Sequence, residues 1–209
     1  MSEEKTIEEY IQEQRLAVKS NPECGNSHYN LGTALLSVRN TEEAEEEFKK
    51  AVECSPHLAE AFVQLGGICL QRGDIDGCLA YNQRAVDARP RFAEGYGNIA
   101  FIHMQKGDYD KAIELLTKAV RFNPYFIQGF ATLANAYLFK GRIDESIETN
   151  FKALEIDPNF ALAHNNLAIA YLEKGNPVKA VEHCDRAREL GYEVAPEVLK
   201  EVDAHRGDK

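Results

Sequence analysis

The pattern of apolar positions in residues 93–126 predicts two amphipathic helices in succession. Gly107 lies between the two apolar faces, where a left-handed residue ends a helix, and Asp108 is placed to cap the next one. Pro124 ends the second helix because it lacks a backbone N–H and clashes in a helix interior. The first face comprises Tyr96, Ile99, Ala100 and His103, and the second comprises Ala112, Leu115, Leu116, Ala119 and Val120.

The same two-helix pattern recurs with a period of 34 residues, marked by proline at positions 22, 56, 90, 124 and 158. Counted from residue 25, position 8 of every repeat is Gly or Ala, and position 27 is always Ala. Position 15 is Gly in every repeat except the first, which has Arg39. Small residues at a fixed phase allow the two helices to pack closely. The pattern therefore predicts an all-α chain that forms one continuous solenoid.

The period divides the chain into five repeats between two capping segments. Residues 6–24 are predicted to form an N-terminal capping helix, equivalent to half a repeat and opened by a capping box of Thr6 and Glu9. Residues 195–209 are predicted to form a C-terminal capping helix and tail, and residues 1–5 are expected to be disordered. The five predicted repeats are 25–58, 59–92, 93–126, 127–160 and 161–194.

These repeats resemble the tetratricopeptide repeat family. The resemblance rests on an aromatic residue or histidine at position 4, a Leu or Ile followed by Gly or Ala at positions 7 and 8, and Ala at position 27. It implies a right-handed superhelical solenoid of paired helices. Two repeats depart from the pattern, because position 24 is Asn82 and Asn150 where a bulky apolar residue is expected.

Composition narrows the classes of function. The formal net charge is −10 and no basic stripe is visible, so we expect neither nucleic-acid binding nor attraction to an anionic membrane surface. No run of 18 apolar residues occurs, which argues against membrane insertion, and the acidic N-terminal residues do not read as a secretory signal. Five cysteines without CxxC spacing favour free thiols in a reducing compartment, so we expect a cytoplasmic protein.

No residue pattern indicates catalysis. Residues 95–100 match a GxGxxA dinucleotide-binding motif by letter, but they lie inside a predicted helix with no strand before it. The adjacent His183 and Cys184 make a poor chelate because neighbouring helical residues point in different directions. His103 is interpreted as a hydrogen-bonded interior residue. We therefore expect no enzyme activity, no cofactor and no metal.

The family resemblance implies that the first helix of each repeat lines a concave groove. Position 6 then forms a ladder of mostly amide side chains, similar to the asparagine ladder of O-linked N-acetylglucosamine transferase arrays, although a merely solvated face is the alternative. Amides both donate and accept hydrogen bonds, which suits the backbone of a bound peptide. Replacing Asn98 and Asn166 by Ala is expected to leave folding intact and to weaken binding. The predicted groove residues are Asn30, Gln64, Asn98, Thr132, Asn166, Tyr29, Phe101, Asn135, Asn165, Glu60, Glu94, Gln71, Gln105 and Phe139.

The predicted function is a non-catalytic scaffold or adaptor that binds an extended or helical segment of a partner protein. Glu60 and Glu94 make part of the groove acidic, so a neutral to basic segment is expected. Family members that clamp the C-terminal carboxylate of heat-shock proteins use Lys at positions 2 and 5, and this chain has no Lys or Arg there. A heat-shock carboxylate-clamp adaptor is therefore not expected. Self-assembly into a homo-oligomer and a regulatory subunit of a separate enzyme are the alternatives.

Overall fold

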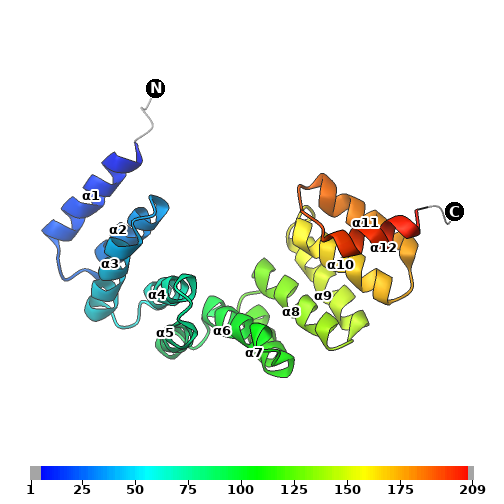
Figure 1. Ribbon diagram of the computed structural model, residues 1–209. Helices are drawn as coiled ribbons and strands as arrows, with labels where there is room; N and C mark the ends of the chain where they lie inside the picture. Colours follow the sequence, from blue (N-terminus) through cyan, green and yellow to red (C-terminus); the bar gives the residue numbers. More distant parts are fainter. Residues whose placement is uncertain (1–5, 207–209) are drawn as a thin grey trace. The chain divides into compact units, whose positions relative to one another are not determined.

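The computed structural model describes residues 6–206, which form twelve α-helices and no strand (Figure 1). The all-α class predicted from the periodicity is thereby confirmed. Residues 1–5, for which disorder is expected, and residues 207–209, at the end of the expected tail, lie outside the described residues. None of the described helices has the length and apolar content needed to cross a bilayer.

The chain divides into two compact units, Met1–Ile99 and Ala100–Lys209, with α6 contributing to both. The helices found in the first unit are α1 (Ile7–Ser20), α2 (Gly25–Ser37), α3 (Thr41–Cys54), α4 (Ala59–Gln71), α5 (Ile75–Ala88) and the start of α6 (Ala93–Gln105). The second unit contains the end of α6, α7 (Tyr109–Phe122), α8 (Ile127–Phe139), α9 (Ile143–Ile156), α10 (Ala161–Glu173), α11 (Pro177–Glu189) and α12 (Pro196–Ala204).

Within each unit, helices pair in sequence order. The closest pairs are α2 with α3 and α4 with α5 in the first unit, and α8 with α9 and α10 with α11 in the second. We call the earlier helix of each pair the first helix and the later one the second helix. The first helix is 13 residues long in all five repeats. The turn after it places position 15 in the left-handed region, at φ 62° for Arg39 and 69° to 77° for the equivalent glycines.

Small residues form the contact between paired helices. The alanines at position 27 all have an exposed fraction of 0%. Gly66, at position 8, shows why size matters, because a Cβ there would collide with the side-chain amide of Asn82. Close approach of the two helices thus depends on residues that have almost no side chain.

Both ends of the described chain carry an additional helix. At the C-terminal end, α12 packs against α11 and buries Val202 completely. Arg206 follows α12 and binds the Asp185 carboxylate with two hydrogen bonds of 2.9 and 2.5 Å. At the N-terminal end, α1 packs against α2 through Ile11 and leaves Leu16 63% exposed. The capping box predicted at the start of α1 is present.

Candidate functional site

An open pocket of about 220 Å³ lies in the second unit, where the first helices of three repeats contribute its walls. Side chains of α6, α8 and α10 line this pocket, and α8 contacts α10 directly. We call it the Phe101 pocket, and its residues are Phe101, Met104, Ala131, Thr132, Asn135, Leu162 and Asn166. Four of these residues are among the predicted groove residues, and Met104, Ala131 and Leu162 are not. Those three occupy positions 12, 5 and 2 of their repeats, so the repeat phase was the signal that could have identified them.

The Phe101 pocket combines apolar surface with one available amide. The Phe101 side chain is 42% exposed although it is aromatic, and the Met104 and Leu162 side chains are half-buried. Asn135 is also half-buried, and its side chain makes no hydrogen bond to another described residue. A partly exposed aromatic ring beside an unused amide is suited to binding a group that has both apolar and polar parts.

The predicted amide ladder is largely engaged within the chain. Asn98 donates from Nδ2 to Asn82 Oδ1 over 2.9 Å, and Thr132 donates to the Gln128 carbonyl oxygen over 2.8 Å. Asn166 is 5% exposed, and its Nδ2 lies 3.3 Å from the Ala131 carbonyl oxygen and 3.5 Å from Asn150 Oδ1. Asn98 and Asn166 therefore join adjacent repeats, whereas the Thr132 hydrogen bond stays within α8.

The same hydrogen bonds explain the two departures from the repeat pattern. Asn82 and Asn150 are buried at position 24, with exposed fractions of 1% and 0%. Each donates to a carbonyl oxygen of its own helix and offers Oδ1 to the asparagine at position 6 of the next repeat. Where position 24 is Phe48 or Leu116, the following position 6 is Gln64 or Thr132. An asparagine at position 24 of one repeat is thus matched by an asparagine at position 6 of the next repeat.

The remaining predicted groove residues differ in accessibility. Asn165 is 7% exposed, and its Oδ1 is buried without a hydrogen-bond partner among the described residues, so it is not accessible as it stands. Phe139 is 59% exposed and stacks on Tyr109, with ring centroids 5.0 Å apart. The exposed members are Asn30, Gln71 and Gln105, and the half-buried members are Tyr29, Gln64 and Glu94.

The predicted acidic character of the groove is weakened by an ion pair in the first unit. Arg89 donates two hydrogen bonds to the Glu60 carboxylate, at 2.6 and 2.9 Å. This bidentate geometry satisfies both carboxylate oxygens. Glu60 therefore presents less negative charge to a ligand than the sequence alone suggests.

Two histidines occupy position 4 in equivalent surroundings but face different partners. The Nε2 atoms of His28 and His164 lie 2.8 Å and 3.1 Å from the carbonyl oxygens of Pro22 and Pro158. His28 Nδ1 lies 2.6 Å from the Glu47 carboxylate, whereas His164 Nδ1 lies 3.0 Å from His183 Nδ1.

The surroundings favour the charged form of Glu47 but the neutral form of His183. Burial acts to raise the pKa of the Glu47 carboxyl, but hydrogen bonds from Lys50 and His28 outweigh it and the pKa lies below its ordinary value. Burial lowers the pKa of His183, and the neighbouring His164 lowers it further. Within residues 6–206, no three His, Cys, Asp or Glu side chains come together in an arrangement that could hold a metal ion.

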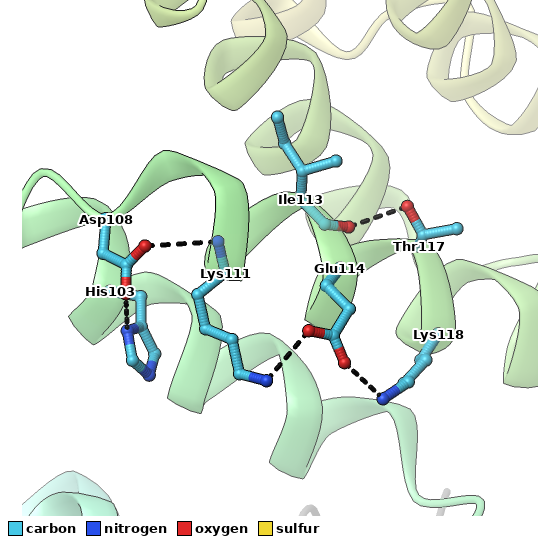
Figure 2. A network of polar contacts seen from close by, with 7 residues as sticks. All are labelled: His103, Asp108, Lys111, Ile113, Glu114, Thr117 and Lys118. Carbon is cyan, nitrogen blue, oxygen red and sulfur yellow. Dashed lines mark hydrogen bonds and ion pairs between the residues drawn. The ribbon is translucent and has the colours of Figure 1, made fainter.

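Charged side chains near the end of α6 are engaged with one another, as Figure 2 shows. His103 Nδ1 lies 3.1 Å from the Asp108 carboxylate, which also accepts from the Lys111 backbone N–H and so caps α7 as predicted. Along α7, hydrogen bonds from Lys111 and Lys118 lower the pKa of Glu114 to about 2. His103 is therefore part of the turn between two helices, and none of these residues lines the Phe101 pocket.

Comparisons with known proteins agree with the arrangement of helices. Models described as tetratricopeptide repeat match residues 15–59 and 93–126, and a model described as TPR repeat matches residues 134–175. Together these matches cover more than half of the chain. No curated protein matches the chain.

Solved structures share the fold at low sequence identity. YrrB is 21% identical, with a TM-score of 0.67, and the match covers 94% of this chain and 99% of YrrB. MamA from Desulfovibrio magneticus RS-1, solved from residue 41 to its end, is 21% identical, with a TM-score of 0.66, and the match covers 80% of this chain and 94% of the solved MamA chain. Yeast Tom70 is 19% identical, with a TM-score of 0.72, covering 100% of this chain but 45% of Tom70. These similarities establish the solenoid fold of paired helices.

Proposed function

Because the chain belongs to the tetratricopeptide repeat family, we propose that it is a non-catalytic interaction module that binds a peptide segment of a partner protein. The site lies on the first helices, and the Phe101 pocket is the part of it in the second unit. YrrB is described as a TPR protein with an unusual peptide-binding site, which is consistent with this proposal.

The observation that carries the proposal is the exposed Phe101 ring at the edge of an open pocket. Aromatic residues that remain accessible beside a concave surface are the usual anchors of protein interfaces. The pocket draws its residues from α6, α8 and α10, so a bound segment would contact three consecutive repeats. The polar groups around it are amides and a hydroxyl, which recognise a peptide backbone by hydrogen bonding.

The rest of the chain favours a protein partner in the cytoplasm. A net charge of −10 opposes binding to nucleic acid, whose phosphates require a basic surface. Cys24, Cys54, Cys69, Cys78 and Cys184 are all free thiols, as suits a reducing compartment.

A pull-down with three immobilised proteins tests the proposal. The wild type is compared with Phe101→Ala and with Phe151→Ala, which removes a ring of similar exposure, 40% against 42%, from a second helix. We expect the Phe151→Ala protein to retain the partner and the Phe101→Ala protein to lose it. Equal capture by all three proteins would contradict a groove site, and recovery of the chain itself as the sole prey would establish self-assembly instead.

A further inference from the structure

We infer that the Phe101 pocket selects an extended, uncharged peptide segment that inserts one branched aliphatic or aromatic side chain. This inference rests on the proposed function and narrows it, because it names the chemistry of the bound segment.

The first helices around the pocket carry almost no charge. α8 contains no Asp, Glu, Lys or Arg, and α10 contains none before Glu173 at its last position. The part of α6 in the second unit, residues 100–105, contains none either. A protein with a net charge of −10 therefore has an electrically neutral surface on these helices.

Two of the three lysines that directly follow these helices already have partners, whereas Lys106, which follows α6, is exposed and makes no ion pair with a described residue. Lys140 follows α8 and lies 3.0 Å from the Asp110 carboxylate, and Lys174 follows α10 and lies 2.6 Å from the Asp144 carboxylate. Lys140 and Lys174 are thus each paired with an acid on the second helix of the preceding repeat. The pairing reduces the electrostatic attraction that either group could offer to a charged ligand.

The volume of the pocket fits one side chain. A dry cavity of about 150 Å³ lined by apolar side chains holds a benzene molecule. A pocket of about 220 Å³ therefore accepts a phenyl ring or a branched aliphatic group, but not two such groups. Met104 adds a flexible wall that can adjust to either shape.

The available amide favours an extended segment over a helix. Asn135 has two N–H donors and a carbonyl acceptor that no described residue uses. A helical peptide has its own backbone groups paired in its interior, whereas an extended peptide presents N–H and C=O groups along its length. Asn135 lines the pocket and can therefore pair with the backbone beside the inserted side chain.

A charged side chain would find no compensating partner in the pocket. Moving an ion out of water is costly unless an opposite charge or several hydrogen bonds replace the water. The lining provides two asparagines and a threonine, and two of these three side chains donate hydrogen bonds within the chain. The sequence led us to expect a neutral to basic segment. At this pocket we infer that the bound segment is neutral.

The test is selection of a random, phage-displayed library of 12-residue peptides on the whole protein, followed by affinity measurements on synthetic copies of the enriched peptides. We expect the enriched peptides to share one bulky apolar residue flanked by uncharged residues. Replacing that residue by Asp, or Phe101 by Ala in the protein, should weaken binding at least about tenfold. The control variant Phe151→Ala should bind as the wild type does.

A second variant tests the role of charge without changing the size of a side chain. Asn135→Asp places a carboxylate in the pocket. We expect this variant to bind the neutral peptides more weakly than the wild type does, and to bind peptides that contain lysine more tightly. Neutral peptides that bind Asn135→Asp as well as the wild type would overturn the inference.

The remaining outcomes separate this inference from the proposed function. Enriched peptides that depend on Phe101 but carry lysine or arginine at the inserted position, and weaken with added salt, would overturn the inference and leave the proposed function standing. Peptides that bind the Phe101→Ala protein equally well, or a library without any enrichment over an unrelated protein, would overturn both.

Discussion

Asn98 donates a hydrogen bond from its side-chain amide to Oδ1 of Asn82, over 2.9 Å and between two adjacent repeats. Asn82 is 1% exposed, so removing the Asn98 side chain takes the hydrogen-bond donor away from a buried oxygen. We expect Asn98→Ala to lower the free energy of unfolding by about 1–3 kcal/mol, the usual cost of a buried polar group left unpaired. Urea unfolding followed by circular dichroism measures this loss.

Two further variants test the explanation. Asn30 occupies the same position in the first repeat but is exposed and makes no side-chain hydrogen bond to a described residue, so Asn30→Ala should be nearly neutral. The double variant Asn82→Leu with Asn98→Thr copies the pair Leu116 and Thr132 and should regain stability. Equal losses for Asn30→Ala and Asn98→Ala would show that the pair has no special role.

Arg39 adopts a left-handed conformation that glycine provides in the other repeats. Its φ is 62°, a region that costs a residue with a Cβ roughly 1–2 kcal/mol, although glycine loses more backbone entropy on folding. We expect Arg39→Gly to stabilise the protein by roughly 0.5–1 kcal/mol, seen as a higher unfolding midpoint. The reverse change, Gly107→Ala at φ 75°, should destabilise it; a stabilised Gly107→Ala protein would refute the account.

The pair formed by His164 and His183 predicts acid sensitivity. Burial, and then the neighbouring His164, hold the pKa of His183 below its ordinary value of 6.5, while Glu182 acts in the opposite direction and Lys179 in the same one. As the pH falls below about 6.5, the unfolded chain therefore takes up this proton before the folded one does. We expect the unfolding midpoint to fall as the pH is lowered from 7 to 5, in thermal scans at constant ionic strength.

The first repeat suggests the variant that should remove this sensitivity. His183→Glu would place a carboxylate opposite His164, as Glu47 lies opposite His28. Hydrogen bonds from Lys50 and His28 hold the pKa of Glu47 below its ordinary value of 4.5, and Arg186 follows position 183 as Lys50 follows Glu47, so such a pair loses stability only at lower pH. The exposed His57→Gln serves as control and should keep the wild-type profile. An unchanged profile for His183→Glu would assign the acid response to other groups.

The five cysteines should differ in reactivity. The Ser27 side chain and backbone hydrogen-bond Cys24 and lower its thiol pKa, whereas burial raises the pKa of Cys54, Cys69, Cys78 and Cys184. Because the thiolate is the reactive form, Cys24 should react first with a thiol reagent at neutral pH. Stopped-flow labelling should show one fast phase that Cys24→Ser removes; a fast phase that persists would point to another thiol.

Local rules in the sequence predicted much of the fold. Gly107, Asp108 and Thr6 have the turn and capping roles that their residue types indicated. Such features depend on a few neighbouring residues and on backbone geometry, so the repeat period is enough to locate them. The same period indicated Phe101 and Asn135 as groove residues, and both line the pocket.

Side-chain pairs between repeats could not be predicted in the same way. Asn82 was read as a packing anomaly and Asn98 as part of a binding ladder, yet one hydrogen bond joins them. That contact depends on which way each amide points after the repeats have stacked, and the period alone does not determine it. The expectation that Asn98→Ala leaves folding intact is therefore revised, and Asn135 becomes the better amide for testing binding.

The asparagine pairs also determine how this chain can change in length. They join the second repeat to the third and the fourth to the fifth, whereas the first and third repeats have an apolar residue at position 24. Removing the third repeat alone would leave Asn82 facing Thr132, with a buried amide oxygen and no matching asparagine. Removing the second and third together would bring Phe48 to Thr132 and leave no amide oxygen unpaired. Among the second to fourth repeats, the unit that can be deleted without leaving an asparagine unmatched is thus a pair of repeats, 68 residues long.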